Sequence, residues 1–195
     1  MQQMLIIAYG VSSLIFLLVI RKLLLENERL RNQAFSDRLT GLANRALFMD
    51  RLALKVEHAK RYHEMIGVVF LDLDGFKAIN DKHGHDAGDE VLRVISQRID
   101  SCTRGSDTVA RWGGDEFAII LPEAQNINDV SEIANRLIDV INEPIIFKGK
   151  EMKVGTSIGI SFHPINGETP DQLIEEADHA MYRAKAEGKN CYRLA

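Results

Sequence analysis

The sequence predicts an α/β domain in which helices cover a central β-sheet. Residues 65–71 are almost wholly apolar, which is typical of a strand buried on both faces. The segments around this strand place apolar residues at helical spacing, so they predict amphipathic helices that cover it. Gly113 and Gly114 lie between two short apolar runs and predict a β-hairpin whose turn needs positive φ.

Size and composition narrow the class of protein. The 195 residues, 46% of them hydrophobic, suffice for one core and one globular domain. A net charge of −4 provides no general basic field, so we expect no nucleic acid polymer as a partner, and an anionic ligand must be held locally. Cys102 and Cys191 are too few for a disulfide framework or a zinc site, which suits a reducing compartment.

The first 22 residues predict a membrane anchor. Residues 4–20 are almost wholly apolar, and about 17 helical residues cover roughly 25 Å, near the lower limit for crossing a bilayer. Arg21 and Lys22 follow directly, so the positive-inside rule places the rest of the chain in the cytoplasm. No basic residue precedes the run, which disfavours a cleaved signal peptide; a buried helix of a soluble domain is the alternative.

Residues 23–35 predict a helical linker. A seam with seven-residue spacing comprises Phe16, Leu23 and Leu30, with Ile20, Asn27 and Ala34 four residues after each. This seam favours a short parallel coiled coil, although so few heptads fit a plain linker helix equally well.

The domain that follows opens with a helix and a strand. Gly41 interrupts the helical pattern, and Asn44 is the expected N-cap of an amphipathic helix over residues 46–63. The strand after this helix ends in Asp72 and Asp74, which share one face because they lie two positions apart. We interpret Asp74 as the cap of the next helix, whereas Asp72 has no such explanation and is costly there unless a cation or a donor meets it.

The next polar stretch predicts a turn, a short helix and a loop. Free backbone N–H groups at residues 75–80, together with Lys77, could hold phosphates. Asp86 is the expected N-cap of a helix over residues 90–101, with Asp89 in the capping position three residues later. Two histidines lie in the same loop, but no thiol or third imidazole is near, so we expect no zinc site.

Two carboxylates, Asp115 and Glu116, follow the glycine pair directly. A hairpin tip without Cβ atoms lets a ligand approach the backbone closely, and paired acids beside it suit divalent cations. A solvated hairpin with two surface acids is the alternative explanation of this stretch alone.

The C-terminal part predicts two helices, a hairpin and a strand. The expected ranges are a helix over 126–141, a hairpin around 148–150, a strand over 156–162, and a helix that ends at Gly188. Thr169 begins that last helix with a capping box and with proline at the first helical position. Lys185 and Lys189 near its end either favour the helix dipole or contact phosphates.

Five segments in order resemble the GGDEF family of diguanylate cyclases over residues 36–195. They are residues 37–45, 70–81, 84–89, 113–117 and 177–185, and the fourth reads Gly113-Gly114-Asp115-Glu116-Phe117. The resemblance implies a palm-like nucleotidyl cyclase fold, with a central mixed β-sheet flanked by helices. It also implies condensation of two GTP molecules into cyclic di-GMP with release of pyrophosphate. A catalytically silent relative that binds GTP or cyclic di-GMP to regulate a partner is the alternative.

The same resemblance implies roles for individual residues. The ligands of Mg²⁺, with Mn²⁺ as the alternative ion, would be Asp72, the Leu73 carbonyl, Asp115 and Glu116. The catalytic residues would be Asp115 or Glu116 as proton acceptor and Lys77, which stabilises charge on the phosphates. The substrate-binding residues would be Asn80, His85, Asp89, Gly113, Gly114, Lys185 and Lys189, of which Asn80 and Asp89 read guanine. The chain departs from the family pattern at Lys189, often an arginine there, and at Asp115, often a glutamate.

A product-inhibition site and a dimer are implied as well. Arg104 and Asp107 match the family's RxxD inhibitory site for cyclic di-GMP, with Arg136 as a second contact. Because the product is two-fold symmetric, each domain would hold one GTP in a C₂ homodimer. With the anchor, these features predict a single-pass protein of the bacterial inner (cytoplasmic) membrane with a cytoplasmic catalytic domain.

Overall fold

The computed structural model describes residues 18–22, 26, 34–124 and 126–195. Contacts between Cα atoms divide the chain into two units, residues 1–36 and residues 37–195. Most of the predicted linker over 23–35 and most of its heptad seam lie outside the described residues, so both remain predictions. All elements described below belong to the second unit.

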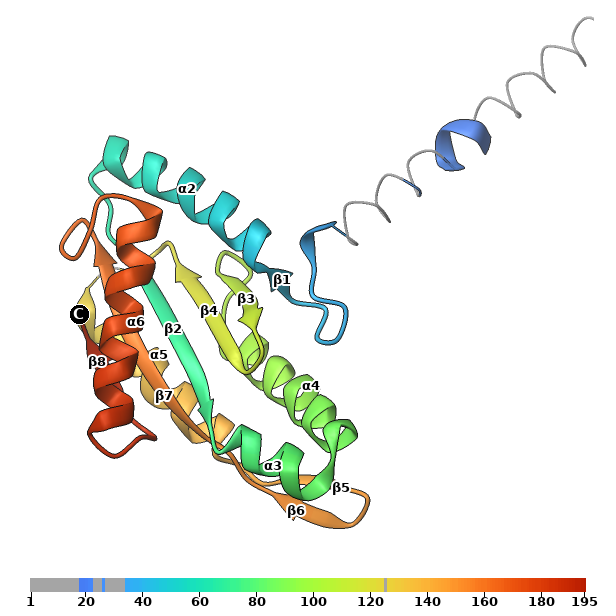
Figure 1. The fold of residues 1–195 in the computed structure, drawn as a ribbon. Coiled ribbons are helices and arrows are strands. Elements are labelled where there is room, and N and C mark those ends of the chain that lie inside the picture. Colours follow the sequence, from blue (N-terminus) through green and yellow to red (C-terminus); the bar gives the residue numbers. More distant parts are fainter. Residues whose placement is uncertain (1–17, 23–25, 27–33, 125) are drawn as a thin grey trace, which may run out of the picture. The chain divides into compact units, whose positions relative to one another are not determined.

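A six-stranded mixed sheet forms the centre of this unit, with strand order β1-β3-β4-β2-β7-β8 (Figure 1). Its strands are β1 (Ala43–Asn44), β2 (Ile66–Asp74), β3 (Thr108–Gly113), β4 (Glu116–Leu121), β7 (Gly155–His163) and β8 (Tyr192–Leu194). Strand β2 pairs antiparallel with both β4 and β7, whereas the pairs β1–β3 and β7–β8 are parallel. A separate hairpin consists of β5 (Ile145–Phe147) and β6 (Lys150–Met152). The predicted central mixed sheet is confirmed.

Helices cover both faces of the sheet. They are α2 (Arg45–Tyr62), α3 (Phe76–His83), α4 (His85–Ser101), α5 (Ile127–Ile141) and α6 (Pro170–Ala186). One buried cluster joins α2 and α6 to the sheet, and the other joins α3, α4 and α5 to the opposite face. Side chains along β2 alternate between these clusters, with Phe70 on the α2/α6 face and Leu71 on the other. Burial on both faces confirms β2 as the central strand.

The structure confirms some predicted helix starts and corrects two. The Asn44 side chain accepts a hydrogen bond from Leu47 N, and Thr169 forms the expected capping box with Gln172. Asp86 is not an N-cap. The N-cap is Gly84, whose φ of 84° ends the preceding helix, so that α4 already begins at His85. Asp74 does not cap α3 either: the N-cap is Gly75, which makes no side-chain hydrogen bond.

The predicted membrane localisation is overturned. Among the residues that the structure describes, no helix is long and apolar enough to cross a bilayer. Of the apolar run and its basic flank, only residues 18–22 are described. The sequence-based estimate of about 17 residues already lay at the lower limit for crossing a bilayer.

Candidate active site

Acids from two neighbouring strands meet at one end of the sheet. Asp72 on β2 and Glu116 on β4 are directly opposed in the antiparallel register. Side chains of opposed residues lie on the same face, so both carboxylates share the α2/α6 face with Phe70. The adjacent acid is tied to the same strand end, because Leu73 N donates a 3.2 Å hydrogen bond to the Asp115 carbonyl. Carboxylates from two neighbouring strands therefore lie together at this end of the sheet.

The turn between β3 and β4 leaves its backbone open. The register shifts between Arg111 and Gly113, and Gly114 adopts φ 56°, a conformation that favours glycine. Both glycines are exposed, and a Cβ atom built on either would meet no atom within 4 Å. The two glycines therefore leave open space on the Cβ side of this Gly-Gly turn (residues 113–114), where a ligand can approach the main chain.

Helix α6 brings a cation to the acids. Lys185 Nζ lies 2.9 Å from Asp72 Oδ2, and the two side chains are 30% and 16% exposed. The pair is thus largely shielded from water, where an ion pair is stronger than at an open surface. Lys185 thus supplies the cation that a carboxylate at Asp72 needs at this position.

The acids beside the turn hold their protons more tightly than ordinary carboxyls. Burial raises the pKa of Asp115, and the negative charge of Asp72 raises it further. The pKa of Glu116 is raised for the same two reasons in the same order. The Lys185 ammonium opposes both shifts. The three carboxylates therefore repel one another, and an added cation would relieve that repulsion.

The oxygen ligands available here suit a hard divalent cation, although the carboxylates are not close enough together to form a preformed metal site. Carboxylate and carbonyl oxygens are the ligands that Mg²⁺ and Mn²⁺ prefer. Within the described ranges, no three histidine, cysteine, aspartate or glutamate side chains are grouped closely enough to hold an ion. Asp72 is instead paired with Lys185.

Asp74 forms hydrogen bonds with strand β7 and with the segment after α6. Its carboxylate accepts from Ser157 Oγ at 2.9 and 3.0 Å and from Asn190 N at 3.0 Å. Lys189, at φ 64°, precedes that asparagine, so Asp74 fixes the backbone beside this predicted substrate-binding lysine. The carboxylate that was predicted as a cap thus serves a contact between residues far apart in the sequence.

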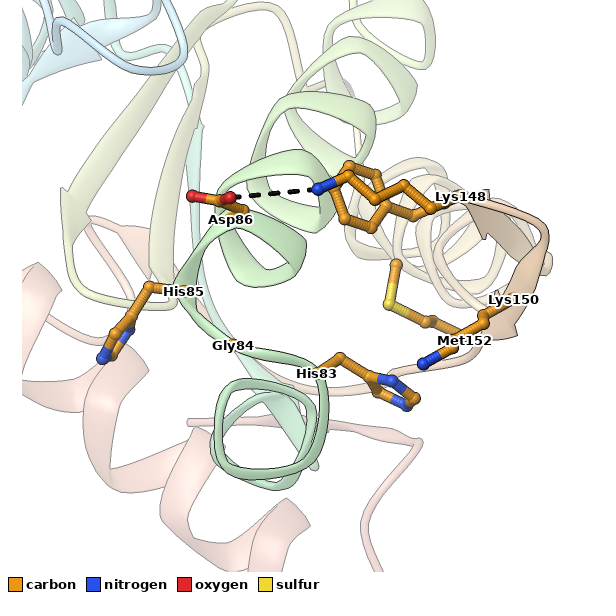
Figure 2. Close-up of a pocket in the computed structure, with 8 residues that line it drawn as sticks. His83, Gly84, His85, Asp86, Lys148, Lys150 and Met152 are labelled. Atoms are coloured by element: carbon orange, nitrogen blue, oxygen red, sulfur yellow. Dashed lines mark ion pairs between the residues drawn. The ribbon is translucent and has the colours of Figure 1, made fainter.

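The predicted guanine-reading residues lie where α3 and α4 pack together. Asn80 and Asp89 are both half-buried, the first on α3 and the second on α4. A Cβ atom on Gly88 would lie 2.0 Å from Asn80 Oδ1, so glycine lets the asparagine side chain rest on the α4 backbone. His85 is exposed and points away from the β5–β6 hairpin, as Figure 2 shows. Lys77 is exposed on α3 and forms no ion pair with the described residues.

The three predicted inhibition-site residues cluster around the turn before β3. Asp107 Oδ2 accepts a 2.7 Å hydrogen bond from Arg104 N, and Arg136 Nη2 donates to the Cys102 carbonyl at 2.6 Å. Burial raises the pKa of Asp107, and the charges of Arg104 and Arg136 oppose that rise. Two guanidinium groups therefore lie near one carboxylate on the surface.

Arg111 stabilises the Gly-Gly turn, although no functional role for it was predicted from the sequence. Its Nε and Nη2 atoms donate to the Gly114 carbonyl at 2.9 and 2.7 Å, and Nη1 lies 3.3 Å from both carboxylate oxygens of Asp37. Asp37 is held in turn by Thr40, through its backbone N–H and its hydroxyl. Two features of the sequence could have indicated this role. One is an arginine two residues before the glycine pair, and the other is the Asp-x-x-Thr segment at the start of the domain, which contains its partner Asp37.

Comparison with known proteins gives a family match. The family model described as "Diguanylate cyclase, GGDEF domain" matches residues 34–191. The chain is 43% identical over 171 residues to the diguanylate cyclase TpbB of Pseudomonas aeruginosa, and 40% identical over 160 residues to the response regulator PleD of Caulobacter vibrioides. These alignments cover 87% and 80% of this chain but 39% and 35% of the relatives, so the chain spans well under half the length of these curated relatives.

Solved structures agree with this match. A structure of TpbB from P. aeruginosa that comprises only the GGDEF domain aligns with a TM-score of 0.80 at 42% identity, covering 82% of this chain and 94% of that one. The coiled coil and GGDEF domain of DgcB from Caulobacter crescentus, solved in complex with c-di-GMP, aligns with a TM-score of 0.83 at 28% identity, covering 90% and 93%.

Proposed function

Because this chain belongs to the GGDEF-domain family of diguanylate cyclases, we propose that it condenses two GTP molecules into cyclic di-GMP and pyrophosphate. The observation that carries the proposal is the register of β2 and β4, which opposes Asp72 and Glu116 beside a turn of two exposed glycines. Lys185 adds a cation at the same place. This arrangement offers oxygen ligands, a cation and an accessible backbone to a triphosphate.

Diguanylate cyclases of this family generally use a divalent metal, and the acids beside the turn fit one. Asp72, Asp115, Glu116 and the Leu73 carbonyl would hold Mg²⁺ or Mn²⁺. When bound, such an ion neutralises the triphosphate and lowers the pKa of the attacking 3′-hydroxyl. On metal binding, Lys185 would exchange its contact with Asp72 for the phosphates.

The protein's own groups supply the rest of the proposed reaction. Asp115 or Glu116 would accept the proton of the 3′-hydroxyl, because a raised pKa makes each a better base than an ordinary carboxylate. Lys77 and Lys185 would stabilise charge on the phosphates, and Gly113, Gly114 and Lys189 would contact the nucleotide. Asn80 and Asp89 would read guanine, with His85 beside them, since a carboxylate accepts from N1–H and the N2 amine.

The proposed enzyme would act as a homodimer and would be inhibited by its product. Each domain would bind one GTP, and a C₂ dimer would bring the two nucleotides together. Arg104, Asp107 and Arg136 would bind the product cyclic di-GMP, because arginine forks fit phosphates and guanine edges.

A turnover assay tests the proposed activity. The full chain is incubated with GTP and Mg²⁺, alongside Asp115→Asn and the matched control Asp139→Asn, which changes an exposed aspartate of α5. We expect cyclic di-GMP from the parent and from Asp139→Asn, and a loss of at least about a hundredfold in Asp115→Asn. Saturable GTP binding without product, in the parent and in a cross-linked dimer, would instead identify a silent binding module.

A further inference from the structure

A cavity of about 300 Å³ lies between the α3–α4 turn and the β5–β6 hairpin. We call it the hairpin pocket, and its functional lining consists of His83, Asp86, Phe147, Lys148, Lys150 and Met152. Figure 2 shows that His85, although it belongs to the same turn, points away from the other side chains of the pocket. His85 belongs to the lining of the hairpin pocket, but its side chain is not among the ligand contacts considered below.

Two lysines from the hairpin supply positive charge. Lys148 Nζ lies 4.0 Å from Asp86 Oδ2, and the two side chains are 72% and 87% exposed. Such a long, solvated pair contributes little, so Lys148 can leave Asp86 at small cost. Lys150 forms no ion pair with the described residues, and its amino group points toward the His83 ring in Figure 2.

His83 adds an unused hydrogen-bonding group. Its Nδ1 atom is shielded from water and has no hydrogen-bond partner among the described residues. A proton on this atom would be a buried donor without an acceptor, so the tautomer with the proton on Nε2 is favoured. The Nε2–H group then has no acceptor among the hydrogen bonds of the described residues, so it can donate to a ligand.

The rest of the wall is apolar. Met152 is 4% exposed, and Phe147 is half-buried. Lys148 Nζ lies 4.9 Å from the centroid of the Phe147 ring. A thioether and an aromatic ring thus adjoin two ammonium groups, a combination that suits a ligand with a compact apolar part and an anionic part.

We propose that the hairpin pocket binds a small phosphate monoester, with its phosphate between Lys148, Lys150 and His83 and its organic group against Phe147 and Met152. A dianionic phosphate can satisfy two ammonium groups and one N–H donor at once. Asp86 opposes this binding, because its carboxylate repels the ligand and competes for Lys148. The proposal therefore predicts opposite effects of two substitutions in one pocket.

The test uses the methionine methyl signals of the full chain in NMR, with EDTA present and phenyl phosphate as the probe. Met152, assigned with Met152→Leu, reports from inside the pocket. We expect a saturable shift of this signal, a Kd raised about tenfold by Lys150→Ala, and a Kd lowered about twofold to fivefold by Asp86→Asn. The matched control Lys153→Ala removes an exposed lysine that does not line the pocket, and it should change the Kd less than about twofold.

Two further probes separate the parts of the ligand. Inorganic phosphate should bind more weakly than phenyl phosphate, and phenol should not shift the signal. No saturable shift at millimolar phenyl phosphate would overturn the proposal. Equal effects of Lys150→Ala and Lys153→Ala, or weaker binding by Asp86→Asn, would also overturn it. Because Lys150 and Asp86 are both exposed, each variant is expected to keep its fold, which its thermal melt checks.

Discussion

Asp115 has opposite consequences for folding and for the proposed chemistry. Burial and the Asp72 charge raise its pKa above the ordinary value of 3.8. A carboxyl whose pKa is higher in the folded chain binds its proton more tightly when folded. It therefore favours folding at low pH, and this contribution is lost as the pH rises through the raised pKa. At neutral pH the ionised Asp115 opposes folding.

We therefore predict that Asp115→Asn stabilises the protein in EDTA at pH 7, raising Tm by roughly 2 °C. The gain should vanish well below pH 3.8, where the carboxyl is protonated in both the folded and the unfolded chain. Thermal melts across this pH range measure the effect, with Asp139→Asn as the control. A lower Tm for Asp115→Asn at pH 7 would show that burial and the Asp72 charge do not make the ionised Asp115 unfavourable in the folded chain.

Substitution of Arg104 tests the proposed product-inhibition site. Arg104 is exposed and its charge acts on Asp107, and removing its side chain should leave the acids of β2 and β4 untouched. We predict that Arg104→Ala raises the cyclic di-GMP concentration for half-inhibition at least about tenfold, since a bidentate phosphate contact is lost. Turnover assays with added product measure this value, and Arg93→Ala is a control on an exposed face of α4. Unchanged inhibition in Arg104→Ala would rule out this site.

At the scale of elements, the close approach of α6 to β7 positions Lys185. A Cβ atom on Gly159 would lie 1.9 Å from the Ala177 carbonyl and 2.3 Å from Met181 N, both backbone atoms of α6. The helix therefore contacts the strand directly at this glycine. Ser161 Oγ reinforces the contact by donating to the Leu173 carbonyl at 2.6 Å.

We predict that Gly159→Ala destabilises the protein by about 2–3 kcal/mol, because helix backbone cannot give way as a side chain can. Urea unfolding measures the change. Gly105→Ala is the matched control, since a Cβ atom there meets nothing within 4 Å, and it should change stability by less than about 0.5 kcal/mol. Equal stability of the two variants would mean that α6 does not pack on β7 as described.

Helix caps could be predicted from the sequence where the capping contact lies within a few residues. Asn44 and Thr169 were recognised as caps because each satisfies backbone N–H groups within three residues. Asp86 looked equally suitable, but the positive φ of Gly84 starts α4 earlier. Asp74 was misassigned because its partners, Ser157 and Asn190, are far away in the sequence.

At the scale of the whole molecule, the strand order brings the proposed site together. Strands β3, β4 and β2 are neighbours although α3 and α4 separate β2 from the other two in the chain. The periodicity of the sequence contains no information on this order, and the resemblance to a family implied only a central mixed sheet flanked by helices. The pairing of Lys185 with Asp72 and the bracing of the turn by Arg111 depend on the same non-local arrangement.

The central claim is that Asp72 and the acids after the Gly-Gly turn hold a divalent cation over a nucleotide triphosphate. A crystal structure of the full chain with Mn²⁺ and a non-hydrolysable GTP analogue tests it most directly, through the anomalous signal of the metal. We predict Mn²⁺ at about 2.1–2.2 Å from an Asp72 carboxylate oxygen and from Asp115 or Glu116, with Lys185 moved from Asp72 to the phosphates. A nucleotide bound with its metal away from these acids, and Lys185 still paired with Asp72, would contradict the account.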